Sequence, residues 1–113
     1  MKVRSLAGAA DGRVSHGTDI AKRVVLGAGD VPTVTNLSQA TLAPGQVATG
    51  HAHADMWEVF LVVAGGGTMT VDGSTVDLEA GTCVVIEPGE HHELSNTGAD
   101  DLVVTYFGVV PQR

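Results

Sequence analysis

Apolar and polar residues alternate in short runs along most of the chain, and glycine or proline interrupts these runs every eight to twelve positions. The runs are rich in Val, Thr, Leu and Ile, residues that favour the pleated and half-buried surface of a sheet. No stretch keeps a helical period of 3.6 residues over three turns. Short strands at this spacing, separated by turn residues, predict an all-β sandwich or barrel.

The pattern predicts nine strands. They are expected at 22–26, 33–42, 47–53, 57–63, 67–71, 74–78, 83–86, 92–96 and 102–110. The clearest turn is Asp72-Gly73, because this pair can adopt the positive φ angles of a type I′ hairpin. The sequence contains neither an internal repeat nor a linker, so residues 1–113 are expected to form a single domain, an antiparallel β-barrel.

The segment Val59–Val63 is apolar at every position, so both faces of its strand are expected to be buried. A small barrel leaves one face of each strand in solvent. Covering the outer face therefore requires a second layer of sheet or a partner subunit, and we expect a homodimer. Cys83 alternates within an apolar strand and is expected to be a buried, small hydrophobic residue.

Composition narrows the range of partners. The 113 residues are 43% hydrophobic and 17% charged, which suits a globular chain with one hydrophobic core. A net charge of −7 with only six Lys and Arg argues against nucleic-acid and membrane partners, which attract clustered positive charge. The chain has one cysteine, no apolar run as long as a membrane span and no apolar stretch near Met1 long enough for a secretory signal. We expect a cytoplasmic protein.

Four of the five histidines fall in two pairs, His51 with His53 and His91 with His92. Side chains two residues apart on a strand point to the same face, so His51 and His53 are expected to face together, and Glu58 follows on the next strand. A lone histidine is usually a hydrogen-bonded surface or core residue. A cluster of imidazoles with a carboxylate instead suits a divalent first-row transition metal.

The spacing of these residues resembles the two sequence motifs of the cupin superfamily. The fixed positions of the first motif, over 45–65, are matched by Gly45, His51, His53, Glu58 and Gly65. The second motif, over 81–96, is matched at Gly81, Gly89, His92 and Asn96. Glu87 stands where the family usually has proline, and Pro88 follows it. Two motifs in order and at the right spacing are a far more specific signal than either alone.

The resemblance implies a small single-domain cupin of type 2, a six-to-eight-stranded jelly-roll barrel with one divalent transition metal at one end. Carried over by position, the metal ligands are His51, His53, Glu58 and His92. His91 then points away from the metal, because successive strand residues face opposite sides. The ligand set suits Mn, Fe, Ni, Zn or Cu and does not choose among them.

Such a ligand set leaves a divalent ion with one or two open coordination positions. These open positions favour a metal-dependent enzyme, and the resemblance allows an oxygenase, isomerase, cyclase or lyase acting on a small oxygen-rich or aromatic molecule. The alternative is a non-catalytic metal-containing module, because no acid or base can be picked from the sequence. Five large side chains suit either a pocket or, more commonly, the core: Met56, Trp57, Phe60, Met69 and Tyr106. His16 lies outside both motifs and is expected at the surface.

Overall fold

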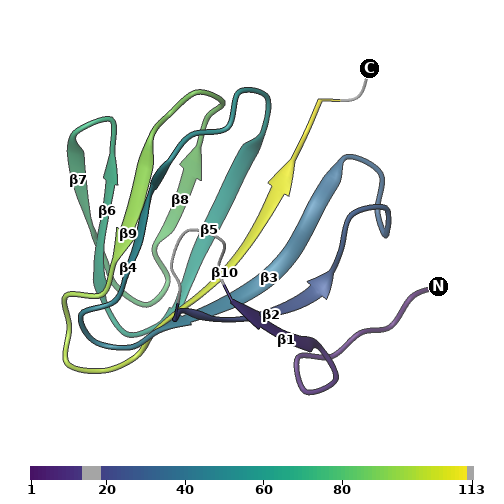
Figure 1. Ribbon diagram of the computed structural model, residues 1–113, viewed down its shortest axis with the longest axis horizontal. Coiled ribbons are helices and arrows are strands. Elements are labelled where there is room, and N and C mark those ends of the chain that lie inside the picture. Colours follow the sequence, from purple (N-terminus) through teal and green to yellow (C-terminus); the bar gives the residue numbers. More distant parts are fainter. Residues whose placement is uncertain (14–18, 112–113) are drawn as a thin grey trace.

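The structure, a computed structural model, describes residues 1–13 and 19–111, so His16 lies outside the described residues. Ten strands and no helix are found within these ranges (Figure 1). The strands are β1 (Ala10–Arg13), β2 (Ala21–Leu26), β3 (Val34–Leu42), β4 (Val47–His51), β5 (Trp57–Ala64), β6 (Gly67–Val71), β7 (Ser74–Leu78), β8 (Cys83–Ile86), β9 (His92–Ser95) and β10 (Leu102–Val109). Within the same ranges, no helical segment has the length and hydropathy needed to traverse a bilayer.

The strands form two antiparallel sheets that stand as opposite walls of a barrel (Figure 1). One sheet has six strands in the order β1-β2-β3-β10-β5-β8, and the other has four in the order β4-β9-β6-β7. From β3 onward the chain passes back and forth between the sheets, except at the β6–β7 hairpin. This path makes β4 and β9 neighbours although they are distant in the sequence, and it brings the two sequence motifs together.

The core lies between the two sheets and is built by inward-facing residues of β3 and of β5 to β10, together with Ile20 just before β2. Its most deeply buried members are Ile20, Leu42, Val62, Met69, Ile86, Leu102 and Val104, each at most 2% exposed. Burying an aliphatic side chain of this size stabilises the folded state by roughly 1.5–3 kcal/mol relative to leaving it in water. The barrel therefore has an apolar core of its own, separate from any ligand.

The predicted strands are confirmed, with shifts of at most two residues at their ends. The type I′ turn is also confirmed, with φ angles of 46° at Asp72 and 83° at Gly73. The sequence pattern does not predict β1, which pairs with β2 and extends the edge of the larger sheet. The strand expected over 47–53 ends at His51, so His53 lies in the loop that follows.

Two expectations of burial on the outer face of the larger sheet are not met within the single chain. Phe60 and Val62 are buried, but Leu61 and Val63 are 44% and 49% exposed, so β5 is buried on one face only. Cys83 pairs with Leu61, shares its outward direction and is exposed. The physical reason is that no described residue forms a layer over this sheet, although its sequence is apolar on both faces.

The outward residues of β5 and β8 together form an exposed apolar stripe. Its large members are Trp57, Leu61, Val63 and Val85, which are 42–52% exposed and which we call the outer apolar face. Large apolar groups gathered on one surface are typical of a protein–protein contact.

Asn96 fastens the end of β9 to two other parts of the chain. Its buried side chain donates hydrogen bonds to the carbonyl oxygens of Leu42, at 2.8 Å, and Asp100, at 2.9 Å. Its side-chain oxygen accepts a hydrogen bond from the backbone N–H of Gly98 at 2.9 Å. A single amide therefore joins the end of β3 to the loop that leads into β10.

Replacing Asn96 with alanine should destabilise the fold by about 2–3 kcal/mol, because the buried partners of the amide would lose their hydrogen bonds. Urea unfolding followed by circular dichroism measures this change. Thr97→Ala, at the exposed neighbouring position, is the matched control and should change the free energy of unfolding by less than about 0.5 kcal/mol. Equal stability of the two variants would contradict the assigned role.

Candidate metal centre

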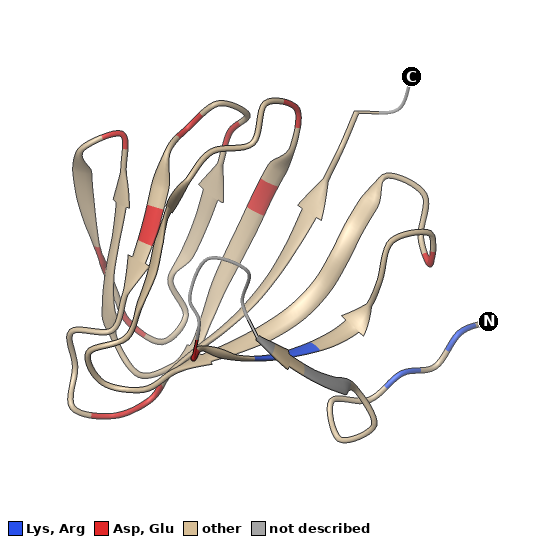
Figure 2. Cartoon of the chain, in the orientation of Figure 1, with Lys and Arg blue, Asp and Glu red and all other residues tan. Residues whose placement is uncertain are grey.

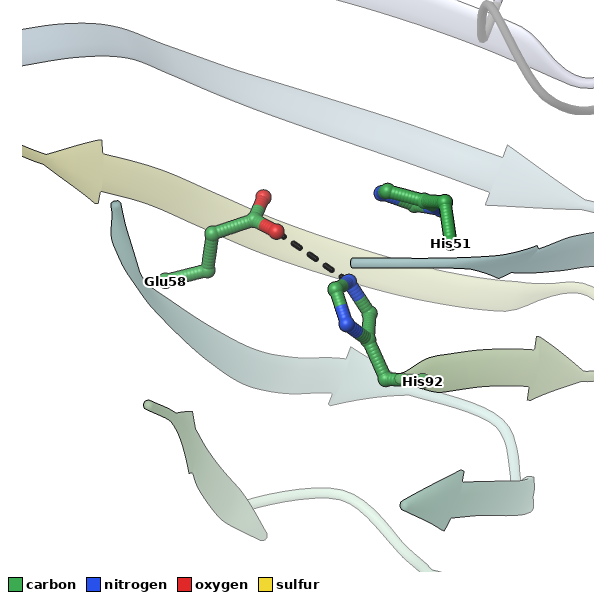
Figure 3. A group of neighbouring side chains, drawn as sticks. All are labelled: His51, Glu58 and His92. Atoms are coloured by element: carbon green, nitrogen blue, oxygen red, sulfur yellow. Dashed lines mark ion pairs between the residues drawn. The ribbon is translucent and has the colours of Figure 1, made fainter. Parts of the chain in front are cut away.

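Three side chains from three strands converge at one end of the barrel. They are His51 at the end of β4, Glu58 in β5 and His92 at the start of β9, and Figure 3 shows them pointing toward one another. One potential ligand atom from each lies within 4.8 Å of the others. Glu58 and His92 are 5% and 3% exposed. The group is therefore compact and largely shielded from water.

The pairing of β4 with β9 positions the two histidines, because His51 lies directly opposite His92 in this ladder. The ladder shifts register between Ala48 and His51. Within this irregularity the backbone N–H of Gly50 donates to a carboxylate oxygen of Glu93, on β9, at 3.0 Å. The carboxylate of Glu93 thus satisfies a backbone donor that the shifted ladder leaves unpaired.

His91 packs against the backbone just before His51 and does not join the group. A side chain on Gly50 would place its Cβ 2.0 Å from Cε1 of His91, so the imidazole ring covers this glycine. His91 is exposed and His92 is buried, in agreement with strand alternation. The turn before them is closed by a hydrogen bond from the N–H of Glu90 to the carbonyl of Glu87, so the register of β9 tolerates the missing proline.

His53 lies beside the group, on the loop after β4. Its Nε2 is 3.4 Å from Oε1 of Glu58, and its side chain is 35% exposed. The N–H of Gly89 donates to the His53 carbonyl at 2.7 Å, which fastens this loop to the turn before β9. The structure thus brings His51, Glu58 and His92 into one tight cluster and places His53 at its more exposed side.

The ring orientations leave the Nε2 atoms available as ligands. Nδ1 of His51 is 3.3 Å from the Thr49 carbonyl, and Nδ1 of His92 is 3.2 Å from the Glu90 carbonyl. A carbonyl accepts but cannot donate, so the proton of each neutral ring is assigned to Nδ1. Hydrogen bonds of this kind commonly orient histidines that bind metals through the other nitrogen.

The buried atoms of Glu58 and His92 lack ordinary hydrogen-bond partners. Oε1 of Glu58 and Nε2 of His92 are 3.1 Å apart, close enough for an ion pair when the ring is protonated. This contact does not qualify as a hydrogen bond, and neither atom has another hydrogen-bond partner among the described residues. The next group near Oε1 of Glu58 is Nε2 of His53, at 3.4 Å. Buried polar atoms are normally paired. Two electron-rich atoms facing one region suit a cation between them, so these residues fit a divalent metal.

Burial and nearby charge act in opposite directions on His92. Burial lowers the pKa of this imidazole. Contacts with the Glu58 carboxylate and the Glu90 carbonyl, together with the negative charges of these two residues, raise the pKa by more. The pKa of His92 is therefore raised above its ordinary value. Burial also raises the pKa of the Tyr106 phenol, against a smaller opposing effect of Ser38. Tyr106 therefore stays neutral at physiological pH and remains able to donate a proton.

The cluster opens into a cavity of about 190 Å³ between the two sheets. Its polar lining consists of Lys22, Asn36, His51, His53, Glu58, His92 and Tyr106, and its other lining residues are Ala40, Leu42, Ala48, Met56, Phe60 and Leu94. Of the five side chains considered for a pocket, Met56, Phe60 and Tyr106 line this cavity, Met69 belongs to the core and Trp57 faces outward. A mainly apolar cavity with a few convergent polar groups is typical of a small-molecule site.

Known proteins match both the sequence and the fold. The family model described as a cupin domain matches residues 38–108. An oxalate-binding protein from Thermotoga maritima is 33% identical over 61 residues, which are 54% of this chain and 50% of that protein. An uncharacterized protein from Sinorhizobium fredii is 38% identical over 50 residues, 44% of this chain and 23% of the relative. The chain thus matches half or less of the length of these curated relatives.

Solved structures share the fold at lower sequence identity. A predicted oxalate decarboxylase from Thermotoga maritima superposes with a TM-score of 0.89 and 21% identity, over 97% of this chain and 100% of that one. A Cupin 2 conserved barrel domain protein from Salinispora arenicola gives a TM-score of 0.74 and 20% identity, over 96% and 88% of the two chains. At these sequence identities, the structural likeness establishes a shared fold only.

The stability of the metal-free protein should fall as pH rises above neutrality. The raised pKa of His92 means that the folded state holds a proton more tightly than the unfolded chain does. This stabilisation is fully present below about pH 6.5, the ordinary pKa of histidine, and is lost as pH rises through the folded-state pKa. Urea unfolding in the presence of a chelator, between pH 6 and 8.5, measures the trend.

Glu58→Gln is the control for this prediction, because it removes the carboxylate that raises the pKa of His92. Its pH dependence in chelator should be flatter than that of the unmodified protein. With metal added, the pH dependence of stability should reverse its sign near pH 6. Protons compete with the metal for the imidazoles there, so stability should rise with pH. Parallel pH profiles for the two metal-free proteins would contradict the role of Glu58 in raising the pKa of His92.

Proposed function

This chain belongs to the cupin domain family, and from that membership and the geometry of the site we propose that it binds one divalent transition metal through His51, His53, Glu58 and His92. The observation that supports this proposal most is that two buried atoms, Oε1 of Glu58 and Nε2 of His92, have no hydrogen-bond partner among the described residues. When bound, such an ion supplies a Lewis acid with open positions for oxygen ligands. The chain's own part is to orient the imidazoles, limit access of water and hold a small molecule in the adjoining cavity.

The ligand we propose is a small oxygen-rich molecule that carries a carboxylate. The relative described as an oxalate-binding protein supports this chemical class. The cavity, of about 190 Å³, accommodates a molecule of this kind beside the cluster. Binding without turnover is the simplest function of such a site.

Catalytic turnover, of the oxygenase, isomerase, cyclase or lyase type, is the second candidate. The observation that favours it is Tyr106, a neutral phenol that lines the cavity and can donate a hydrogen bond to negative charge that develops on a bound molecule. Binding and turnover are separated by incubating the metal-loaded protein with a candidate ligand and following the ligand by NMR. A ligand that stays unchanged over hours identifies a binding module.

Replacing a proposed metal ligand should empty the site while leaving the fold in place. His51→Ala and His92→Ala should each remove most of the bound metal, measured by elemental analysis of protein purified without a histidine tag. His53→Ala should remove less, because this residue is more exposed and lies on a loop. The core is independent of the cluster, so circular dichroism of each variant should still show a folded β protein.

His91→Ala is the matched control for these variants, because His91 is the adjacent histidine and faces outward. Its metal content should equal that of the unmodified protein. Loss of metal in His91→Ala with retention in His92→Ala would show that the ligand register is wrong by one residue.

A second copy of the chain is the partner that we propose for the outer apolar face. The face is apolar and carried by adjacent strands, so two copies related by a twofold axis can bury it against itself. Leu61→Glu should then yield a monomer by light scattering at micromolar concentration. Val76→Glu is the control, because Val76 is similarly exposed but lies on β7 of the other sheet. A monomeric unmodified protein would contradict the dimer.

A further inference from the structure

Three successive rows of inward-facing residues cross the larger sheet between the candidate metal centre and the far part of the cavity. Strand pairing defines the first row as Asn36, Gly108 and Glu58, the second as Ser38, Tyr106 and Phe60, and the third as Lys22, Ala40 and Val104. The rows therefore offer a carboxylate, then an aromatic pair, then an ammonium group. This order of charged and aromatic groups bears on the length and the charge of a ligand that fits the cavity.

Lys22 is the cation of the cavity lining. It is half-buried between two exposed neighbours, Ala21 and Arg23, so it faces inward while they face outward. Figure 2 shows that the basic residues of the described chain are confined to the N-terminal segment and β2. Lys22 has no ion-pair partner among the described side chains. A half-buried lysine in the cavity lining that has no counter-charge among the described side chains is available to pair with a bound anion.

The row between the two charges is aromatic and rigid. The rings of Phe60 and Tyr106 are stacked, with centroids 5.4 Å apart and planes 20° from parallel. Beside Tyr106, the hydroxyl of Ser38 donates to Oδ1 of Asn36 at 2.8 Å, which holds this part of the wall in place. On the opposite sheet, the pair Ala48 and Leu94 follows the pair His51 and His92. Both walls therefore become apolar next to the cluster.

The spacing of the rows sets the length of a ligand that could touch both ends. The first and third rows are four residues apart along the strands, which is about 13 Å of backbone at about 3.3 Å per residue. The lysine side chain covers part of this distance. A two-carbon dianion held at the cluster is too short to cover the rest, whereas a molecule built on one aromatic ring is long enough.

We propose that Lys22 anchors the far end of the ligand, and that the cavity selects an elongated organic anion over oxalate. Such a ligand has two adjacent oxygens at one end, a flat apolar body and a carboxylate at the other end. Its oxygens face His51, Glu58 and His92, its body lies against Phe60 and Tyr106, and its carboxylate pairs with Lys22. This assignment rests on the proposed metal-dependent function and adds the class of ligand to it.

The test compares two probes that differ only in the far carboxylate. Zinc-loaded protein is titrated with 3,4-dihydroxybenzoate and with catechol by isothermal calorimetry, because zinc undergoes no redox change with either compound. In the unmodified protein, 3,4-dihydroxybenzoate should bind about tenfold more tightly than catechol. In Lys22→Met this preference should fall to less than about twofold, and Lys22→Arg should restore most of it. Oxalate affinity should be the same in all three proteins.

Arg23→Met is the matched control, because it removes the same charge from the neighbouring, outward-facing position. It should keep the tenfold preference. An unchanged preference in Lys22→Met, or an equal loss in Arg23→Met, would overturn the anchor while leaving metal binding intact. If elemental analysis finds no zinc in the unmodified protein, the proposed function fails, and the anchor fails with it.

Discussion

The contact between Glu58 and His92 joins the two sheets at one end of the barrel. Taking a carboxylate out of water is costly, and a nearby cation or protonated imidazole offsets that cost only in part. Here the carboxylate on β5 meets an imidazole on β9 at 3.1 Å, and neither of the two atoms has a hydrogen-bond partner among the described residues. The fold thus holds two polar atoms in an arrangement that by itself is incompletely satisfied. The apolar core supplies the stability that keeps them there.

This arrangement depends on the path of the chain. Because β4 and β9 are paired in the smaller sheet, His51 and His92 face the cavity side by side, and β5 in the larger sheet brings Glu58 to them from the opposite wall. The Glu93 carboxylate then holds the irregular end of β4 from outside the cavity, by accepting a hydrogen bond from the Gly50 N–H. The polar centre is therefore supported by ordinary sheet pairing and needs few specialised contacts.

Periodicity in the sequence predicted the strands, and motif spacing predicted which histidines face inward. The burial of the outer face could not be predicted, because Val59–Val63 is apolar on both sides whether or not another layer covers it. The strand was predicted to continue to His53, but β4 ends at His51. The ring of His53 nevertheless lies beside that of His51, with centroids 4.8 Å apart, as the two-residue spacing predicted. The inward direction of Lys22 follows from the register of β2 against β3, which the sequence alone does not specify.

The back-and-forth path between the sheets also bears on how fast this chain folds. Apart from hairpins such as β6–β7, its ladders join strands that are remote in sequence, as in the pairing of Leu102 with Leu42. Chains dominated by such distant pairings fold slowly, in milliseconds to seconds. Large loops must close, at a cost in entropy, before the stabilising contacts between distant strands can form. The histidines and the glutamate meet only once these late ladders have closed. Because the β4–β9 pairing brings His51 opposite His92, a metal ion held by both histidines binds a chain in which this ladder has already closed.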